Sequence, residues 1–354
     1  MYSGKLITAV ILLTLSHEAF AQVCSAAKLA NILSSTHPLK QDVAVDCDLT
    51  LNKGQIVSKK IVIKGSGASG TTINCNSAQI SDVQIKSEKV IDPATGNINY
   101  SKPENITIQG CTVLGSISIR NGLSSDEIVK ASRQQDYVSM IRSIAPSNIT
   151  LKNLNIQSKG ATPLYVFPGV NHVQLIDSMI SGKAKSAAVY LDAESINNVI
   201  QGNIFKLDTG RELIAIDGSE KNTITNNKFY HVGTKGGIYL YRNCGERQQI
   251  RHTMPSYNQI IANDFYYDTG ISNKPAVYVG SRDGHSSWCK ADQASGKTTY
   301  TFGSSLSNLD HAQFNIIKNN KIHNASLINA IKTNNPTVNS NNSIHENKIF
   351  KAGE

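Results

Sequence analysis

Arginine, tyrosine and histidine side chains gather in one short stretch of the sequence. Its candidate reactive residues are Tyr239, Tyr241, Arg242, Arg251 and His252. An arginine can neutralise a carboxylate, which makes a neighbouring C–H bond acidic, and a second group can then take that proton while an acid protonates the leaving oxygen. We expect Arg242 or Arg251 to act as the neutralising cation or the base. Tyr239, Tyr241 and His252 are the candidate proton donors.

Acidic and aromatic residues recur around this stretch and form a candidate substrate-binding set. Its members are Tyr190, Asp192, Asp217, Tyr241, Glu246, Tyr278 and Arg282. Tyrosines can stack on sugar rings and arginines can pair with carboxylates, so the set predicts a groove for an acidic glycan. Structural roles remain open: outward tyrosines stabilise strand pairing, aspartates bond their own backbone in turns, and Arg242 or His252 can brace a loop.

The segments that carry these side chains alternate as strands with one buried face do. In residues 189–192, 214–217, 238–241 and 277–280, an apolar residue recurs at every second position. The inward set is predicted to be Val189, Leu191, Ile214, Ile216, Ile238, Leu240, Val277 and Val279. Tyr239 and Tyr241 then point outward.

An asparagine motif repeats along most of the chain. An Asn is followed by Ile, Val or Thr two positions later and, in the strong copies, by a second Asn five positions later. Strong copies start at Asn198, Asn222, Asn258, Asn315 and Asn342, and weaker copies at Asn105, Asn148 and Asn171. A period of about 25 residues made of short strands indicates a solenoid. Asparagine tolerates left-handed turns, and stacked amides can hydrogen-bond between coils.

This repeat resembles the right-handed parallel β-helix of pectate-lyase-like proteins and of carbohydrate-binding and sugar-hydrolysis repeats, over most of residues 50–350. The resemblance implies an all-β solenoid that acts on carbohydrate. Related lyases use an arginine or lysine base, sometimes with Ca²⁺. Asp192 and Asp217 alone offer few ligands for a calcium ion. We therefore expect no cofactor, with Ca²⁺ as the alternative.

Hydrolysis by this fold needs a pair of carboxyl groups. The Asp-Asp and Gly-His-Gly patterns of polygalacturonase-like β-helices do not occur in the sequence, and neither does the Asp-Pro-His of alginate epimerases. The nearest substitute is Asp192 with Asp217.

The first 21 residues have the form of a secretory signal, with Lys5, an apolar stretch over Leu6–Leu15 and a small-x-small site at Ala19–Ala21. We expect an exported protein, periplasmic or secreted, without a transmembrane segment. Residues 22–50 are predicted to cap the solenoid with a helix over Gln22–Leu33 that Ser25 N-caps, and residues 51–354 to form the β-helix.

Six cysteines in an exported chain favour disulfide bonds over a metal site, because no Cys-x-x-Cys or His-x-x-x-His spacing occurs. The repeat geometry favours a Cys244–Cys289 bond that joins two long loops. The pairs Cys24–Cys47 and Cys75–Cys111 are further hypotheses, since the sequence does not fix the pairing.

The chain carries 35 Lys and Arg against 26 Asp and Glu, a net charge of +9. This excess suits an anionic partner such as a polyuronate or lipopolysaccharide, although it can also serve solubility alone. No nucleic-acid-binding motif occurs, and the basic residues are scattered, so nucleic acid is not an expected partner. We expect a monomer.

Three insertions exceed what regular coils need, at residues 122–146, 242–257 and 281–313. The first carries a capping box at Ser124 and Glu127 and predicts a helix on the flank of the solenoid. The other two leave one sheet edge on consecutive coils and are expected to wall a groove over Tyr239, Tyr241 and Arg242.

The sequence thus favours an exported lyase that acts on an anionic polysaccharide. The alternatives are a non-catalytic polysaccharide-binding or envelope-assembly protein and a periplasmic metal-loading accessory protein.

Overall fold

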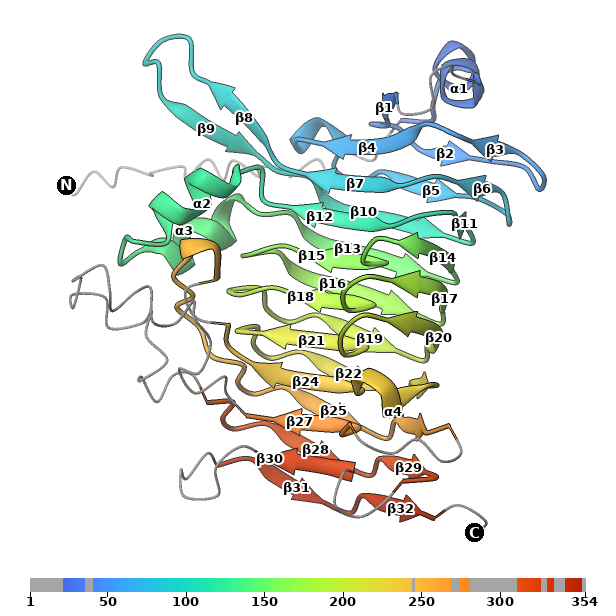
Figure 1. Ribbon diagram of the computed structural model, residues 1–354. Coiled ribbons are helices and arrows are strands. Elements are labelled where there is room, and N and C mark those ends of the chain that lie inside the picture. The colour runs from blue at the N-terminus through green and yellow to red at the C-terminus, as the bar shows by residue number, and fades with distance from the viewer. Residues whose placement is uncertain are drawn as a thin grey trace, which may run out of the picture.

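The computed structural model describes residues 22–35, 41–243, 246–268, 274–280, 311–325, 330–333 and 341–351. In these ranges the chain passes through three short strands per coil, and equivalent strands of successive coils pair in parallel (Figure 1). Three sheets of ten strands each result. The protein is a right-handed parallel β-helix, which confirms the sequence prediction.

We number the sheets in the order in which each coil visits them. Sheet 1 contains β1 Asp42–Ala44, β4 Lys60–Lys64, β7 Val83–Lys86, β12 Ile117–Arg120, β15 Leu164–Val166, β18 Val189–Leu191, β21 Ile214–Asp217, β24 Ile238–Tyr241, β27 Val277–Val279 and β30 Ile331–Thr333. Sheet 2 contains β2 Leu49–Thr50, β5 Thr72–Asn74, β10 Glu104–Gln109, β13 Ser147–Lys152, β16 Asn171–Ile176, β19 Val199–Gln201, β22 Thr223–Thr225, β25 Gln259–Ile261, β28 Ile316–Lys318 and β31 Ser343–His345. Sheet 3 contains β3 Ile56–Val57, β6 Gln79–Ile80, β11 Thr112–Val113, β14 Asn155–Gly160, β17 Met179–Ala184, β20 Ile204–Thr209, β23 Lys228–Phe229, β26 Asp264–Tyr266, β29 Lys321–His323 and β32 Lys348–Phe350.

A few elements lie outside these sheets. An antiparallel hairpin is formed by β8 Glu88–Ile91 and β9 Ile98–Ser101, and it projects from the coils in Figure 1. The helices are α1 Ala26–Leu33, α2 Ser125–Ala131, α3 Tyr137–Ile144 and α4 Val232–Lys235, with short 3-10 turns η1 Ser66–Ala68 and η2 Glu246–Gln248.

A helix is present at the N-terminal end, but it begins at Ala26 and not at Gln22 as expected. Ser25 accepts a hydrogen bond from the Lys28 N–H through its side chain and so N-caps α1. Ile32 of this helix is fully buried in the solenoid core. The hypothesised disulfides Cys24–Cys47 and Cys75–Cys111 are both present, whereas Cys244 and Cys289 lie outside the described residues.

The interior is a continuous apolar column, and the inward set was predicted correctly. All eight predicted inward residues have an exposed fraction of 2% or less. Phe205, Phe229 and Phe265 stack on one another inside the column with ring centroids 4.8 and 4.9 Å apart. Because each coil places the same kind of side chain at the same position, neighbouring coils complete each other's core.

Two asparagine ladders run along the solenoid. In one, the side-chain amides of Asn203, Asn227, Asn263, Asn320 and Asn347 hydrogen-bond in sequence at 2.9–3.0 Å. The left-handed backbone that we attributed to the motif asparagines belongs in these strong copies to the residue before them, for example Asn226 at φ 57° and Ala262 at φ 55°. The ladder position therefore requires asparagine for its side-chain amide. The left-handed position before it accepts other residue types, such as alanine at position 262.

The strand register makes a stability prediction. Leu240 is fully buried, whereas its neighbour Tyr239 points outward from sheet 1 and is half-buried beside Tyr278. We expect Leu240→Ala to lower the free energy of unfolding by roughly 2–5 kcal/mol, because it leaves a cavity in the column. Tyr239→Ala should cost clearly less in urea melts; equal losses would contradict the register.

Three of the connections that run from sheet 1 strands to sheet 2 strands are long. The hairpin β8–β9 follows β7, α2 and α3 follow β12, and residues 242–257 follow β24. The first predicted insertion forms two helices rather than the single helix expected. The break falls at Ser132, whose hydroxyl bonds back to the Val129 carbonyl. The hairpin is an insertion that the sequence patterns did not predict. Most of the third predicted insertion, residues 281–310, lies outside the described residues.

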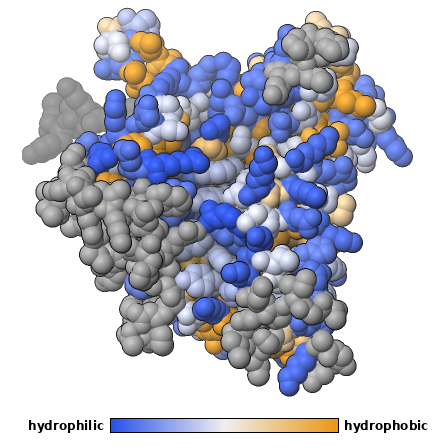
Figure 2. Space-filling model, viewed as in Figure 1, coloured by the Kyte–Doolittle hydropathy of each residue, from blue (hydrophilic) through white to orange (hydrophobic). Residues whose placement is uncertain are grey.

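The surface of the coils is largely hydrophilic in the view of Figure 2. The hairpin is an exception, because Val90, Ile91 and Ile98 are 46, 66 and 57% exposed. Among the described residues, no helix has the length and apolar character that a membrane crossing requires.

Candidate functional site

A cavity of about 330 Å³ lies on the outer face of sheet 1, between helix α2 and the segment that contains η2. We call it the tyrosine cavity. Its lining includes Tyr165, Phe167, Tyr190, Asp192, Arg211, Glu246, Arg247, Gln249 and Arg251, together with Ser125, Ile128 and Val129 from helix α2. The cavity therefore combines aromatic, acidic and basic groups from three coils and two insertions.

The wall of the cavity forms because the insertion after β24 reaches back to the insertion after β12. The Ile250 N–H donates to the Ser132 hydroxyl at 3.1 Å, and His252 Nε2 lies 2.7 Å from the Ser132 carbonyl oxygen. The Gln249 amide donates to the Tyr137 hydroxyl at 3.4 Å. In Figure 1 the η2 segment accordingly lies against the two helices. These contacts join residues more than 100 positions apart in the sequence and cover the strands between them.

The floor of the cavity is aromatic. Tyr165 and Tyr190 occupy equivalent positions on β15 and β18, and their rings stack with centroids 5.0 Å apart. Phe167 lies 4.3 Å from Tyr165, centroid to centroid. Such rings offer an apolar surface edged by hydroxyl groups, which suits a sugar ring better than a wholly apolar ligand.

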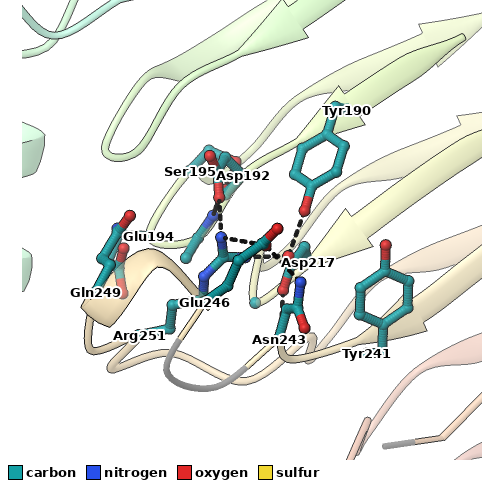
Figure 3. Close-up of polar contacts among 12 residues, drawn as sticks. Tyr190, Asp192, Glu194, Ser195, Asp217, Tyr241, Asn243, Glu246, Gln249 and Arg251 are labelled. Atoms are coloured by element: carbon teal, nitrogen blue, oxygen red, sulfur yellow. Dashed lines mark hydrogen bonds and ion pairs between the residues drawn. The ribbon is translucent and has the colours of Figure 1, made fainter. Parts of the chain in front are cut away.

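A buried arginine connects the acidic groups. Arg251 Nη2 lies 3.3 Å from an oxygen of Asp192 and 3.3 Å from an oxygen of Glu246, and Nη1 contacts Asp217 (Figure 3). Asp192 and Arg251 are each only 4% exposed. The surrounding carboxylates raise the pKa of Arg251 even though burial acts against them, so this side chain stays a cation. It cannot act as a base here.

The tyrosine hydroxyls bond to the same carboxylates. Tyr165 donates to Asp192 at 2.7 Å, and Tyr190 donates to Asp217 at 2.5 Å. Burial, and then the neighbouring carboxylates, raise the pKa of both phenols far above the usual value. Both tyrosines are therefore neutral proton donors.

Asp192 and Glu246 are the two carboxyl groups that line the cavity. One oxygen of Asp192 and one oxygen of Glu246 each lie 3.3 Å from Arg251 Nη2, so these two oxygens are separated by at most twice this distance. Burial raises the pKa of the Asp192 carboxyl, although Arg251 beside it acts in the opposite direction. A carboxyl group with a raised pKa and a second carboxyl group on the same cavity are what acid–base cleavage of a glycosidic bond requires of the protein.

Two of the residues predicted to form the site, Tyr241 and Arg242, do not line this cavity. Arg242 is fully buried and donates from Nη1 to the Arg251 carbonyl oxygen at 2.9 Å. Tyr241 is 1% exposed, and its hydroxyl donates to Glu212 at 2.5 Å. The expected open groove over Tyr241 and Arg242 is therefore corrected: packing covers both side chains. Arg242 holds the backbone of the insertion instead.

The remaining candidates are spread around the site. Tyr239 and Tyr278 lie together on the outer face of sheet 1, with ring centroids 5.3 Å apart, and His252 contacts the ring of Tyr137. Asp217 is fully buried beneath Arg251. None of these four side chains lines the tyrosine cavity as described, and Arg282 lies outside the described residues. Their functional roles stay predictions.

Asp192 and Asp217 were also considered as calcium ligands. Both carboxylates contact the Arg251 guanidinium, so a cationic group already lies between them. In this arrangement the pair does not fit a calcium site. Among the described residues, no group of three or more His, Cys, Asp or Glu side chains is placed to hold a metal ion.

Several cavity residues were not identified from the sequence. Tyr165 was within reach, because Leu164-Tyr-Val166 has the same alternation as the strand of Tyr190. Arg211, Arg247 and Gln249 lie in turns and in the insertion, where no periodic pattern indicates direction. The contribution of helix α2 could not be read from the sequence, since it depends on contacts between distant insertions.

Buried Glu194 gives the site a measurable pH dependence. It accepts from the His252 N–H at 2.7 Å, yet burial raises the pKa of its carboxyl from 4.5 to about 8. Between these values the folded protein binds a proton that the unfolded chain has released. Its contribution to stability should therefore fall as the pH rises from 5 to 8, by at most about 1.4 kcal/mol per pH unit.

Glu194→Gln tests this pH dependence, because the amide keeps the shape and cannot titrate. The difference in free energy of unfolding between native protein and variant, from urea melts at several pH values, should change across this window. Burial lowers the pKa of His252, which changes stability with pH in the opposite direction. This effect is present in both proteins and cancels in the difference. A difference independent of pH would show that Glu194 is ionised in the fold.

Comparisons with known proteins concern the fold. The sequence matches no family model and no curated protein. A tailspike protein of E. coli bacteriophage HK620, in complex with a pentasaccharide, is 12% identical, with 85% of this chain and 50% of that chain covered and a TM-score of 0.46. The A-module of a mannuronan C-5 epimerase from Azotobacter vinelandii is 12% identical, with 88% and 87% covered and a TM-score of 0.33.

XylC in complex with xylose is 11% identical, with 84% of this chain and 55% of that chain covered and a TM-score of 0.41. This chain thus spans half the length of the tailspike chain and little more of XylC. At these identities and TM-scores the likeness adds nothing on function, which has to be argued from this chain's own residues.

Proposed function

We propose that this protein is an exported carbohydrate-active enzyme that binds an anionic polysaccharide in the tyrosine cavity and cleaves a glycosidic bond there. The observation that carries the proposal is the placement of Asp192 and Glu246 on one cavity with an aromatic floor. Export is supported by the two disulfide bonds, which persist in oxidising compartments.

Hydrolysis is the reaction that these groups support best. Asp192, whose pKa burial raises, can protonate the leaving oxygen, and Glu246 can activate water or attack the sugar carbon. Arg251 would hold both carboxyl groups in place, and the aromatic floor formed by Tyr165 and Phe167 would contact the sugar.

Elimination by a lyase is the second candidate, and one observation favours it. Arg247 is exposed at the cavity and makes no ion pair with another described residue, so it is available to neutralise a uronate carboxylate. Glu246 would then take the proton next to that carboxylate, and Tyr165 or Tyr190 would protonate the leaving oxygen.

Incubation with a panel of polyuronates, neutral glycans and lipopolysaccharide tests the proposal. New reducing ends without ultraviolet absorbance would identify a hydrolase, whereas unsaturated products that absorb ultraviolet light would identify a lyase. Binding without any product would identify the non-catalytic alternative. Neither binding nor products with any polymer would refute the proposal.

A further inference from the structure

A second cavity, of about 440 Å³, lies next to the first on the outer face of sheet 1. We call it the basic cavity. The hairpin β8–β9 and the start of helix α2 wall it, and Lys89 of the hairpin forms an ion pair with Glu127 of the helix. Its floor is formed by Lys64, Lys86 and Arg120, which occupy equivalent positions on β4, β7 and β12.

Two of these cations have no acidic partner among the residues that the structure describes. Lys64 pairs with Glu88 at 2.6 Å, but Lys86 and Arg120 form no ion pair with another described residue. Like charges at equivalent positions of adjacent strands repel each other, which makes this pairing unfavourable for the fold alone. A cavity with such a floor is suited to an anionic group that the protein does not itself supply.

The two cavities adjoin each other at the contact between Arg120 and Phe167. The Arg120 guanidinium lies 4.2 Å from the ring centroid of Phe167, and Phe167 lines the tyrosine cavity. The pairing of β12 with β15 and of β15 with β18 places Arg120, Phe167 and Asp192 at equivalent positions of successive coils. Lys86 is thus three coils from Asp192, roughly 14 Å at the usual strand spacing. An oligosaccharide can span this distance, and a disaccharide cannot.

We propose that the basic cavity binds the carboxylate groups of the same polymer that is cleaved at Asp192, so that the substrate is a polyuronate lying along the solenoid axis. This inference rests on the proposed function, because it extends the site in the tyrosine cavity. Lys86 and Arg120 would hold uronate residues three and two coils, respectively, from the cleaved bond. The protein would then discriminate by chain length and charge.

Calorimetric titration tests the proposal with two probe series, oligogalacturonates and oligomannuronates of two to eight residues, on Asp192→Asn protein to prevent turnover. For at least one series the octamer should bind at least about tenfold more tightly than the dimer. Lys86→Gln/Arg120→Gln should remove this advantage and leave dimer affinity within about twofold. Carboxyl-reduced octamers should behave like the dimer.

Lys183→Gln/Lys206→Gln is the matched control, because it removes two exposed cations from sheet 3. It should leave octamer affinity unchanged, and circular dichroism should show every variant folded. If dimer and octamer bind equally, or if the control lowers octamer affinity as much as Lys86→Gln/Arg120→Gln, the basic cavity is not a subsite. If neither the oligogalacturonates nor the oligomannuronates bind, the proposal for the basic cavity is also wrong. Cleavage of an anionic polymer without uronate residues that depends on Asp192 would leave the proposed function intact and refute only the polyuronate assignment.

Discussion

Replacement of Asp192 by asparagine is expected to lower kcat for polysaccharide cleavage by roughly 10²–10⁴-fold, the range that a positioned general acid contributes. The amide keeps the shape of the side chain but cannot deliver a proton to the leaving oxygen. Asp192 lies on the cavity with a raised pKa, and Tyr165 and Arg251 fix its orientation. Reducing-end assays at saturating substrate would measure the loss.

The pH profile separates this role from a structural one. In the native enzyme, kcat should fall on the alkaline side as Asp192 loses its proton, and the residual rate of Asp192→Asn should lack that limb. Asp208→Asn is the control, since Asp208 is exposed on β20 in sheet 3 and should leave kcat unchanged. A native rate in Asp192→Asn would remove this carboxyl from the mechanism.

Replacement of Arg251 by methionine should lower the free energy of unfolding by roughly 3–5 kcal/mol, as expected when one partner of a buried charge cluster is removed. Methionine has a similar length, so the loss reflects charge more than packing. Asp192 and Asp217 would remain buried without the cation that both contact. Urea melts at pH 7 would measure the effect.

Two variants make this prediction specific. Asp217→Asn should restore part of the stability of Arg251→Met, since it removes one of the uncompensated buried charges. Arg247→Met removes an exposed arginine from the same insertion and should change the free energy of unfolding by no more than about 0.5 kcal/mol. If Arg247→Met were as costly as Arg251→Met, the ion cluster would not be what stabilises this segment.

The solenoid and the direction of its side chains could be predicted from local sequence patterns. Strand alternation assigned Leu240 to the core and Tyr190 to the outer face because the two-residue period of a strand is local. The asparagine repeat indicated the coil, since each ladder amide bonds to the same residue type one coil away. The cap at Ser25 and the capping box at Ser124 were likewise local, each being completed within three residues.

Which of the outward residues form a site depends on how distant insertions pack against each other, so it becomes visible in the tertiary structure. Tyr241 and Arg242 looked accessible because a strand pattern distinguishes inside from outside but not exposed from covered. The insertion after β24 turns back onto Ser132, about 120 residues earlier, and buries them while it leaves Tyr165, Asp192 and Glu246 around a cavity. Contacts at that separation depend on how two irregular segments pack, and no periodicity in the sequence records this.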